Sequence, residues 1–209
     1  MRELPMFPLG TVLFPHMVLP LHVFEPRYRT LLEHIMAPGS AREFGVVLIA
    51  RGGEVGGGDL RTDVGTVARV IRSEELDGSR ALVIALGTRR LHVERWLADD
   101  PYPRAEVTER ADTHDDQAVI DASSVTIPRL RRVLALQAER GRGDVAPTFD
   151  LADEPDVACW QAAVLSPLNP HDAQRVLQTD DCADRLRLLD ELLAGIEETL
   201  ELERDLDGP

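Results

Sequence analysis

Short apolar segments separated by turn residues recur through the first half of the chain. They are rich in β-branched residues and have the length of strands. Many short strands with frequent turns are typical of a barrel or a sandwich, and not of a parallel α/β layer. The expected strands cover residues 4–7, 11–14, 18–23, 45–50, 64–71, 81–86, 91–96 and 105–108. Asp77-Gly78 lies between two of them and predicts a tight hairpin.

One helix interrupts these strands. Pro26 suits the first position of a helix, because proline has no N–H to leave unpaired there. Pro38-Gly39 predicts where the helix ends. Between them, apolar residues recur at helical spacing and form one stripe, which consists of Tyr28, Leu31, Leu32, Ile35 and Met36.

The second half of the chain has helical spacing throughout. The first segment, residues 115–140, is ambiguous because Pro128 would either break a helix or begin a new one. A second helix is expected over residues 153–165, a short third one from Asn169-Pro170, and the longest from Asp180. The buried stripe expected for the longest helix is Ala183, Leu186, Leu189, Leu193, Ile196 and Leu200. With acidic residues facing outward, these segments predict a small helical bundle.

Charge divides the chain in the same way. Residues 1–112 carry a net charge of −2 and residues 113–209 a net charge of −12. The stretch 109–116 is polar and has nothing to bury, which suits a boundary. We therefore expect a β-rich pseudo-barrel subdomain over residues 1–112. A helical subdomain that ends in a long acidic helix is expected over residues 113–209.

Composition excludes several classes of function. The total charge of −14 and the pI near 4.8 have the wrong sign for gripping phosphate backbones, and aromatic residues are only 4% of the chain. All 23 basic residues are arginine. The absence of lysine excludes a Schiff-base lysine, a Ser–Lys dyad and the lysine of a phosphate-binding loop. The glycine-rich segment 51–59 is expected to be a plain flexible loop, since it matches no phosphate-binding motif.

Catalytic and metal-binding motifs are absent from the sequence. The chain has no G-x-S-x-G elbow, and its six histidines form no zinc-binding pair. Cys159 and Cys182 are expected to be small buried side chains. We expect no catalytic residue, no cofactor and no metal; a metal site would require ligands from distant segments of the chain. No apolar run is long enough for a signal peptide or a bilayer span, so we expect a cytoplasmic protein without a membrane partner.

Glu25 is the charged residue whose position is most particular, because it lies between an apolar strand and the start of the first helix. A carboxylate there would accept hydrogen bonds from helix amides and complement the helix dipole. We expect it to form a structural junction at this point. Its candidate partners are Arg27, Arg29 and Arg69.

The first thirty residues resemble the start of the Lon protease N-terminal domain. The resemblance rests on LPMFPL at 4–9, VLFP at 12–15 and LPLHVFEPRYR at 19–29. Two weaker segments, GTVARV at 65–70 and GTRRL at 87–91, are similar to strands of the same family. One residue departs from the pattern: His16 follows Phe14-Pro15 where the family often has glycine, which puts the tight turn there in question.

The resemblance implies an α+β fold, with an N-terminal PUA-like pseudo-β-barrel that carries one inserted helix, followed by a C-terminal helical bundle. It also implies a small stand-alone member that lacks ATPase and protease domains. In Lon proteases this domain helps to select unfolded or tagged protein substrates. We therefore expect a non-catalytic, proteolysis-related module that binds polypeptides, with basic client segments favoured by the acidic helical part. The candidates to line an apolar groove are Phe14, Met17, Phe24 and Tyr28, although each of them suits the core better.

Two alternatives stay open. The barrel face would instead bind a small molecule or RNA if its arginines converged into a basic stripe, although acidity and few aromatics argue against RNA. That stripe would consist of Arg61, Arg69, Arg72, Arg89, Arg90 and Arg95. An enzyme would require titratable groups that converge in a deep pocket. The sequence leaves the clients and the oligomeric state open.

Overall fold

The computed structural model describes residues 1–52, 60–76, 80–142 and 146–207. The predicted Asp77-Gly78 hairpin and most of the glycine-rich loop lie outside the described residues. The chain divides into two compact units, Met1–Ala111 and Asp112–Pro209. Within the described residues, no helix combines the length and the apolar character that crossing a bilayer requires.

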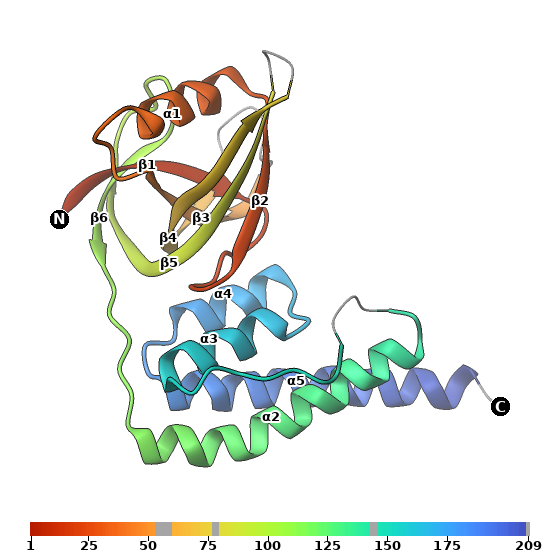
Figure 1. Cartoon of the computed structure of the whole chain (residues 1–209). Helices are drawn as coiled ribbons and strands as arrows, with labels where there is room; N and C mark the ends of the chain where they lie inside the picture. The colour runs from red at the N-terminus through yellow and green to blue at the C-terminus, as the bar shows by residue number, and fades with distance from the viewer. Residues whose placement is uncertain (53–59, 77–79, 143–145, 208–209) are drawn as a thin grey trace. The chain divides into compact units, whose positions relative to one another are not determined.

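The first unit is a six-stranded sheet with one helix (Figure 1). Its elements are β1 (Arg2–Leu9), β2 (Val18–Val23), α1 (Pro26–Met36), β3 (Glu43–Arg51), β4 (Leu60–Glu75), β5 (Ala81–Trp96) and β6 (Arg104–Glu109). The strand order is β2-β5-β4-β3-β1-β6, and β6 also pairs with β5. This last pairing closes five of the strands into a ring, with β2 attached to the outside of β5. The predicted pseudo-β-barrel with an inserted helix is confirmed.

Strand β5 differs from the sequence prediction, because the two strands expected over 81–86 and 91–96 are one strand of 16 residues. Its first part pairs with β2 and its second part with β6. Gly87 lies between the two parts, where an added Cβ would be 2.2 Å from the carbonyl oxygen of Phe14. Glycine at this position therefore lets the strand run on while another backbone segment crosses it closely.

The strand predicted over residues 11–14 is wrong, since this segment is irregular. Its backbone finds a partner outside a strand ladder: the Leu13 carbonyl accepts a hydrogen bond of 2.5 Å from the hydroxyl of Thr66. The turn that follows does form with a histidine in place of glycine. His16 adopts the left-handed backbone conformation, with φ of 64°, and its amide donates to the Gly87 carbonyl at 2.8 Å.

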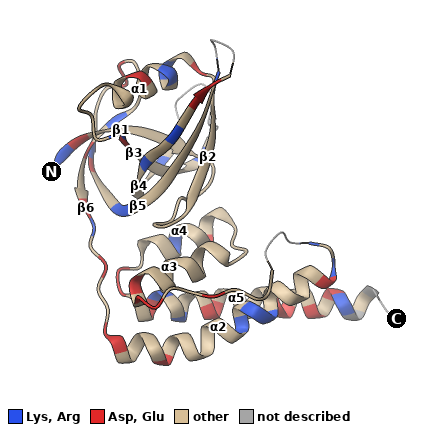
Figure 2. Ribbon diagram, in the orientation of Figure 1, with Lys and Arg blue, Asp and Glu red and all other residues tan. Residues whose placement is uncertain are grey.

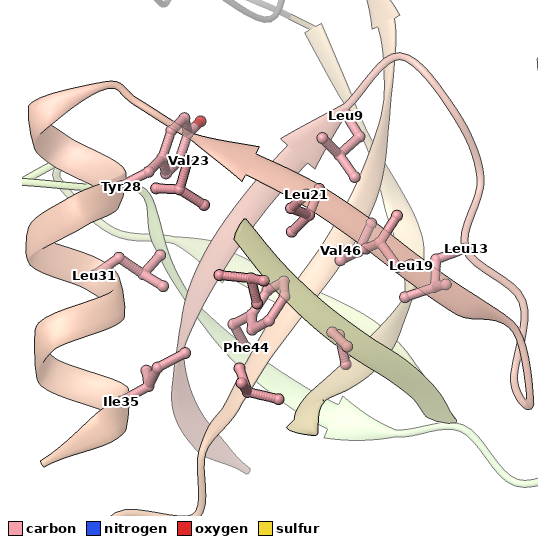
Figure 3. Packing of buried hydrophobic residues seen from close by; sticks show 14 of the residues in the cluster. Leu9, Leu13, Leu19, Leu21, Val23, Tyr28, Leu31, Ile35, Phe44 and Val46 are labelled. Carbon is pink, nitrogen blue, oxygen red and sulfur yellow. The ribbon is translucent and has the colours of Figure 1, made fainter. Parts of the chain in front are cut away.

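The barrel holds its main core between the sheet and α1 (Figure 3). Tyr28, Leu31 and Ile35 are the buried residues of α1, and they belong to the predicted stripe. They pack against side chains of the sheet that include Leu21, Val23, Phe44 and Val46. A second cluster fills the ring itself, and it consists of Leu4, Met6, Val47, Val67, Leu91, Val93, Ala105 and Val107.

The second unit is helical, as predicted. Its helices are α2 (Asp116–Glu139), α3 (Pro155–Leu165), α4 (Pro170–Gln178) and α5 (Cys182–Asp207). Helix α2 continues through Pro128 without a break. The side chain of Asn169 caps α4 by accepting from the amide of Asp172 at 3.0 Å. Part of the acidic surface of α5 is neutralised by α2, because Arg129 lies 2.7 Å from both Asp190 and Glu197.

Candidate functional site

Strand β2 forms an open edge of the sheet, because among the described residues it pairs with β5 alone. Buried and exposed side chains alternate along it, with Leu19, Leu21 and Val23 facing the core. The outer row is Val18, Pro20 and His22, followed by Phe24 with 57% of its surface exposed. Proline has no N–H to give to a neighbouring strand, so Pro20 suits an edge. We call this outer row, including Phe24, the β2 edge.

A groove lies between β2 and the start of α1. Its volume is about 160 Å³, and it is lined by Phe7, Leu9, Pro20, Leu21, His22, Val23, Phe24, Glu25 and Tyr28. The rings of Phe7 and Tyr28 stack with their centroids 3.9 Å apart and their planes inclined by 13°. The lining is mostly apolar, with the imidazole of His22 and the carboxylate of Glu25 as its polar groups. We call this feature the β2–α1 groove.

Glu25 fixes the wall of the groove at the point where the helix begins. Its carboxylate accepts from Nε of Arg27 at 3.0 Å. The guanidinium of Arg27 also lies 4.6 Å from the centre of the Tyr28 ring. The backbone amides of Tyr28 and Arg29 donate hydrogen bonds to the backbone carbonyl of Glu25, at 3.1 and 3.0 Å. The side chain of Glu25 does not cap the helix. Glu25 thus holds α1 through its backbone and Arg27 through its carboxylate.

The four residues proposed from the sequence to line a binding surface lie in different surroundings. Phe24 is exposed and Tyr28 is buried, and both line the β2–α1 groove. Phe14 is buried in the turn before β2, and Met17 is half-buried against the main core. The structure therefore brings Phe24 and Tyr28 together, while Phe14 and Met17 serve the packing of the barrel.

Arg29 and Arg69 lie away from Glu25. Arg29 lines a separate hollow of about 240 Å³ together with Leu32 and Met36. Arg69 binds the carboxylate of Glu43, with its Nη2 at 2.8 Å. Among the three candidate partners of Glu25, the described residues therefore give Arg27 the ion pair.

Glu43 is the centre of an ion cluster that sequence reasoning missed. Its side chain is only 4% exposed and accepts from Arg2 at 2.9 Å, from Arg69 at 2.8 Å and from Arg89 at 3.0 Å. These hydrogen bonds, that of Arg89 above all, outweigh desolvation and lower the pKa of Glu43 from 4.5 to about 2. The cluster joins four strands of the barrel. Its sequence signal is slight, because Glu43 differs from other acidic residues only in opening an apolar strand.

The arginines of the predicted basic stripe interact with carboxylates, aromatic rings and a backbone carbonyl. Arg61 lies 4.5 Å from the centre of the Trp96 ring, and Arg95 pairs with Glu106 at 2.6 Å. Arg90 is buried and donates to the backbone carbonyl of Ala111. Figure 2 shows both signs of charge on the strands of the barrel. This pairing weakens the positive field that a nucleic acid would need.

A second ion cluster lies inside the helical unit. Arg185 is fully buried and donates to Asp112 Oδ1 at 2.7 Å and to the Thr179 carbonyl at 2.8 Å. Its guanidinium lies 3.5 Å from the centre of the Trp160 ring, and the Trp160 indole donates to Asp112 Oδ2 at 2.8 Å. The segment 109–116, expected to bury nothing, thus supplies a carboxylate to the interior of this unit. The sequence signal that was passed over is an arginine in the first turn of α5, where Arg185 is the fourth residue of the helix.

Comparison with known proteins gives one consistent family. The family model of the ATP-dependent protease La (LON) substrate-binding domain matches residues 3–195. Lon protease 2 of Herpetosiphon aurantiacus is 29% identical over 99% of the chain, and the Lon protease of Roseiflexus castenholzii is 31% identical over 88% of it. These matches cover 25% and 23% of the two relatives, so the chain spans about a quarter of their length.

Solved structures show the same likeness. The crystal structure of a Lon N-terminal domain protein from Xanthomonas campestris matches with a TM-score of 0.64 and 27% identity, over 93% of this chain and 98% of that one. The N-terminal domain of a Mycobacterium avium complex Lon protease matches with a TM-score of 0.61, over 92% of this chain and 98% of that one. At 19% identity the second likeness bears on the fold alone.

Proposed function

Because this chain belongs to the family of Lon substrate-binding domains, we propose that it is a non-catalytic module that binds polypeptides. The β2 edge and the β2–α1 groove bind an extended segment of an unfolded or tagged protein client. The observation that carries this proposal is the exposed Phe24, which stands at the end of an open sheet edge and over an apolar groove. The proposal assigns the chain no catalytic residue and no cofactor, and it places the binding in the cytoplasm.

The backbone of β2 offers one half of the interaction. An extended segment adds to an open edge through main-chain hydrogen bonds, which do not depend on the sequence of the segment. Since Pro20 has no N–H, the ladder formed with a client would lack one donor in its middle. This makes the pairing weak for any single client and tolerant of many, as a module that selects unfolded chains requires.

The groove offers the other half. A side chain that projects from the bound segment would pack between Phe24 and the stacked rings of Phe7 and Tyr28, whose centroids lie 3.9 Å apart. A groove of about 160 Å³ fits one or two apolar side chains and no folded surface. The net charge of −14 favours basic residues in the flanks of the segment.

The test is the binding of a labelled, permanently unfolded polypeptide, measured by fluorescence anisotropy at two salt concentrations. Phe24→Asp removes the apolar wall of the groove, and we expect its affinity to fall by about tenfold or more, since a buried aromatic contributes roughly 1.5–3 kcal/mol. Ile71→Asp is the matched control, because Ile71 is 60% exposed on β4 and does not line the groove.

We expect Ile71→Asp to bind within about twofold of the unchanged chain, a difference of under 0.5 kcal/mol. The native form of the same polypeptide, before it is permanently unfolded, should not bind. Equal binding by the Phe24 and Ile71 variants would show that the groove does not hold the client. Binding that disappears at the higher salt concentration would assign the interaction to charge instead of apolar contact.

A further inference from the structure

Three potential metal ligands from distant parts of the chain meet at the beginning of the helical unit. The Nδ1 atom of His114 lies 2.9 Å from Oδ1 of Asp156, and Sγ of Cys182 lies 3.2 Å from the same oxygen. All three donor atoms lie within 4.8 Å of one another. In a tetrahedral zinc site with bonds of 2.0–2.3 Å, neighbouring donor atoms are about 3.4 Å apart, so small side-chain movements would suffice.

The backbone holds these three residues in place. The amide of Cys182 donates to the Thr113 carbonyl at 2.9 Å, and the Thr113 amide donates to the Asp180 carbonyl at 3.1 Å. This pairing fixes the segment before α2 against the start of α5. Asp156 belongs to the first turn of α3. A metal ion at this point would therefore clip together the beginnings of three helices.

The histidine and the cysteine each have an outer partner of the kind that metal sites use. Nε2 of His114 lies 3.4 Å from Oδ1 of Asp116, and donation to this carboxylate would leave Nδ1 free to bind a metal. Nη1 of Arg185 lies 3.6 Å from Sγ of Cys182 and would donate to a thiolate there. The positive charge of Arg185 is itself compensated by Asp112 at 2.7 Å.

We propose that His114, Asp156 and Cys182 bind one Zn²⁺ ion, with water as a fourth ligand. A nitrogen, an oxygen and a sulfur ligand together suit the borderline-soft zinc ion better than magnesium or calcium. On binding, the Cys182 thiol loses its proton to solvent and a Zn–S bond forms, so about one proton is released per ion. His114 and Asp156 are half-exposed, which gives the ion a path from solvent.

The ligands lie in three separate segments, which explains why no spacing in the sequence indicated them. The proposed site shares no residue with the β2 edge or the β2–α1 groove. Its expected effect is on the helical unit, which the bound ion would stabilise because the unfolded chain does not hold the three ligands together.

Isothermal titration calorimetry tests the site by measuring the heat of Zn²⁺ binding to the full chain in two buffers of different ionisation enthalpy. We expect one ion per chain and release of about one proton. His114→Gln and Cys182→Ser should weaken binding by more than about tenfold, and Asp116→Asn, which changes only the outer partner, by about tenfold. His171→Gln is the matched control: its imidazole is 3.7 Å from Asp172 in the same unit, and the variant should bind as the unchanged chain does.

Titration with Co²⁺ gives a second readout, because a cysteine–cobalt bond produces a charge-transfer absorption that His171→Gln keeps and Cys182→Ser loses. His114 lies at the surface, so His114→Gln keeps the test valid if the buried Cys182 variant fails to fold. Absence of Zn²⁺ binding by the unchanged chain would overturn the proposal. Binding that survives His114→Gln, or that releases no proton, would overturn it as well.

Discussion

Glu43 in the barrel and Arg185 in the helical unit are buried side chains of opposite charge, and the groups that compensate them differ. In the barrel, the carboxylate of Glu43 is surrounded by three arginines from other strands, whose side chains are 38%, 55% and 30% exposed. In the helical unit, Arg185 is fully buried, and Asp112 is the carboxylate that the described residues place against it. Its other neighbours are carbonyl oxygens, two thiols and the Trp160 ring.

The two buried charges are compensated in different ways. Around Glu43 the partners are in excess, and each arginine has solvent to turn to, so the loss of one leaves the carboxylate satisfied. Around Arg185 the neutral neighbours help to solvate the guanidinium but do not cancel its charge. Arg185 therefore depends on one ion pair, whereas Glu43 has three arginine partners.

Breaking the ion pair between Asp112 and Arg185 should destabilise the protein most. Asp112→Asn keeps the size of the side chain but leaves Arg185 buried without an anion, which destabilises a protein by about 3–5 kcal/mol. The measurement is urea unfolding followed by the fluorescence of Trp160, in a Trp96→Phe background that leaves it as the only tryptophan. A loss below about 1 kcal/mol would show that the thiols and carbonyls suffice.

A smaller effect is expected at Glu43. Glu43→Gln removes the anion that three arginines share, and because these side chains can turn to solvent we expect a loss of about 2 kcal/mol near neutral pH. Since folding lowers the pKa of Glu43 from 4.5 to about 2, its contribution is fully present above pH 4.5 and is lost as the pH falls towards 2. The difference in unfolding free energy between the unchanged chain and Glu43→Gln should therefore disappear as the pH falls from 4.5 to about 2. A gap that does not change with pH would contradict the role of the carboxylate.

The smallest effect is expected for single arginines of the barrel cluster. Arg2→Gln or Arg69→Gln leaves two arginines on Glu43, so each variant should lower the free energy of unfolding by less than about 1 kcal/mol. The double variant should lose more unfolding free energy than the two single variants together, because it leaves Glu43 with Arg89 in place of three arginine partners. Urea unfolding of the four chains measures this. If Arg69→Gln alone cost as much as Glu43→Gln, the partners would not be in excess.

Elements with local signals were predicted with accurate bounds. Pro26 and Pro38-Gly39 mark the two ends of α1, and alternation along residues 18–23 gives β2. Prediction failed where distant contacts decide. Residues 81–96 form one strand because both β2 and β6 pair with it, which the sequence does not reveal.

The candidate sites follow the same rule. Phe24 and Tyr28 lie close in the sequence and were proposed together, and both line the groove. Glu43 and its arginines come from four strands, and the zinc ligands come from segments 42 and 26 residues apart, so neither cluster has a local pattern. Ion clusters of this kind are specified by the fold as a whole.

Hydrogen exchange of the full chain tests whether the β2 edge binds unfolded polypeptide. The exchange of backbone amides would be compared with and without a saturating amount of the unfolded polypeptide. We expect slower exchange within residues 17–28, which hold β2 and the start of α1, and unchanged exchange in the helical unit. Saturated binding that leaves residues 17–28 unprotected, or that protects only the helices, would contradict the claim.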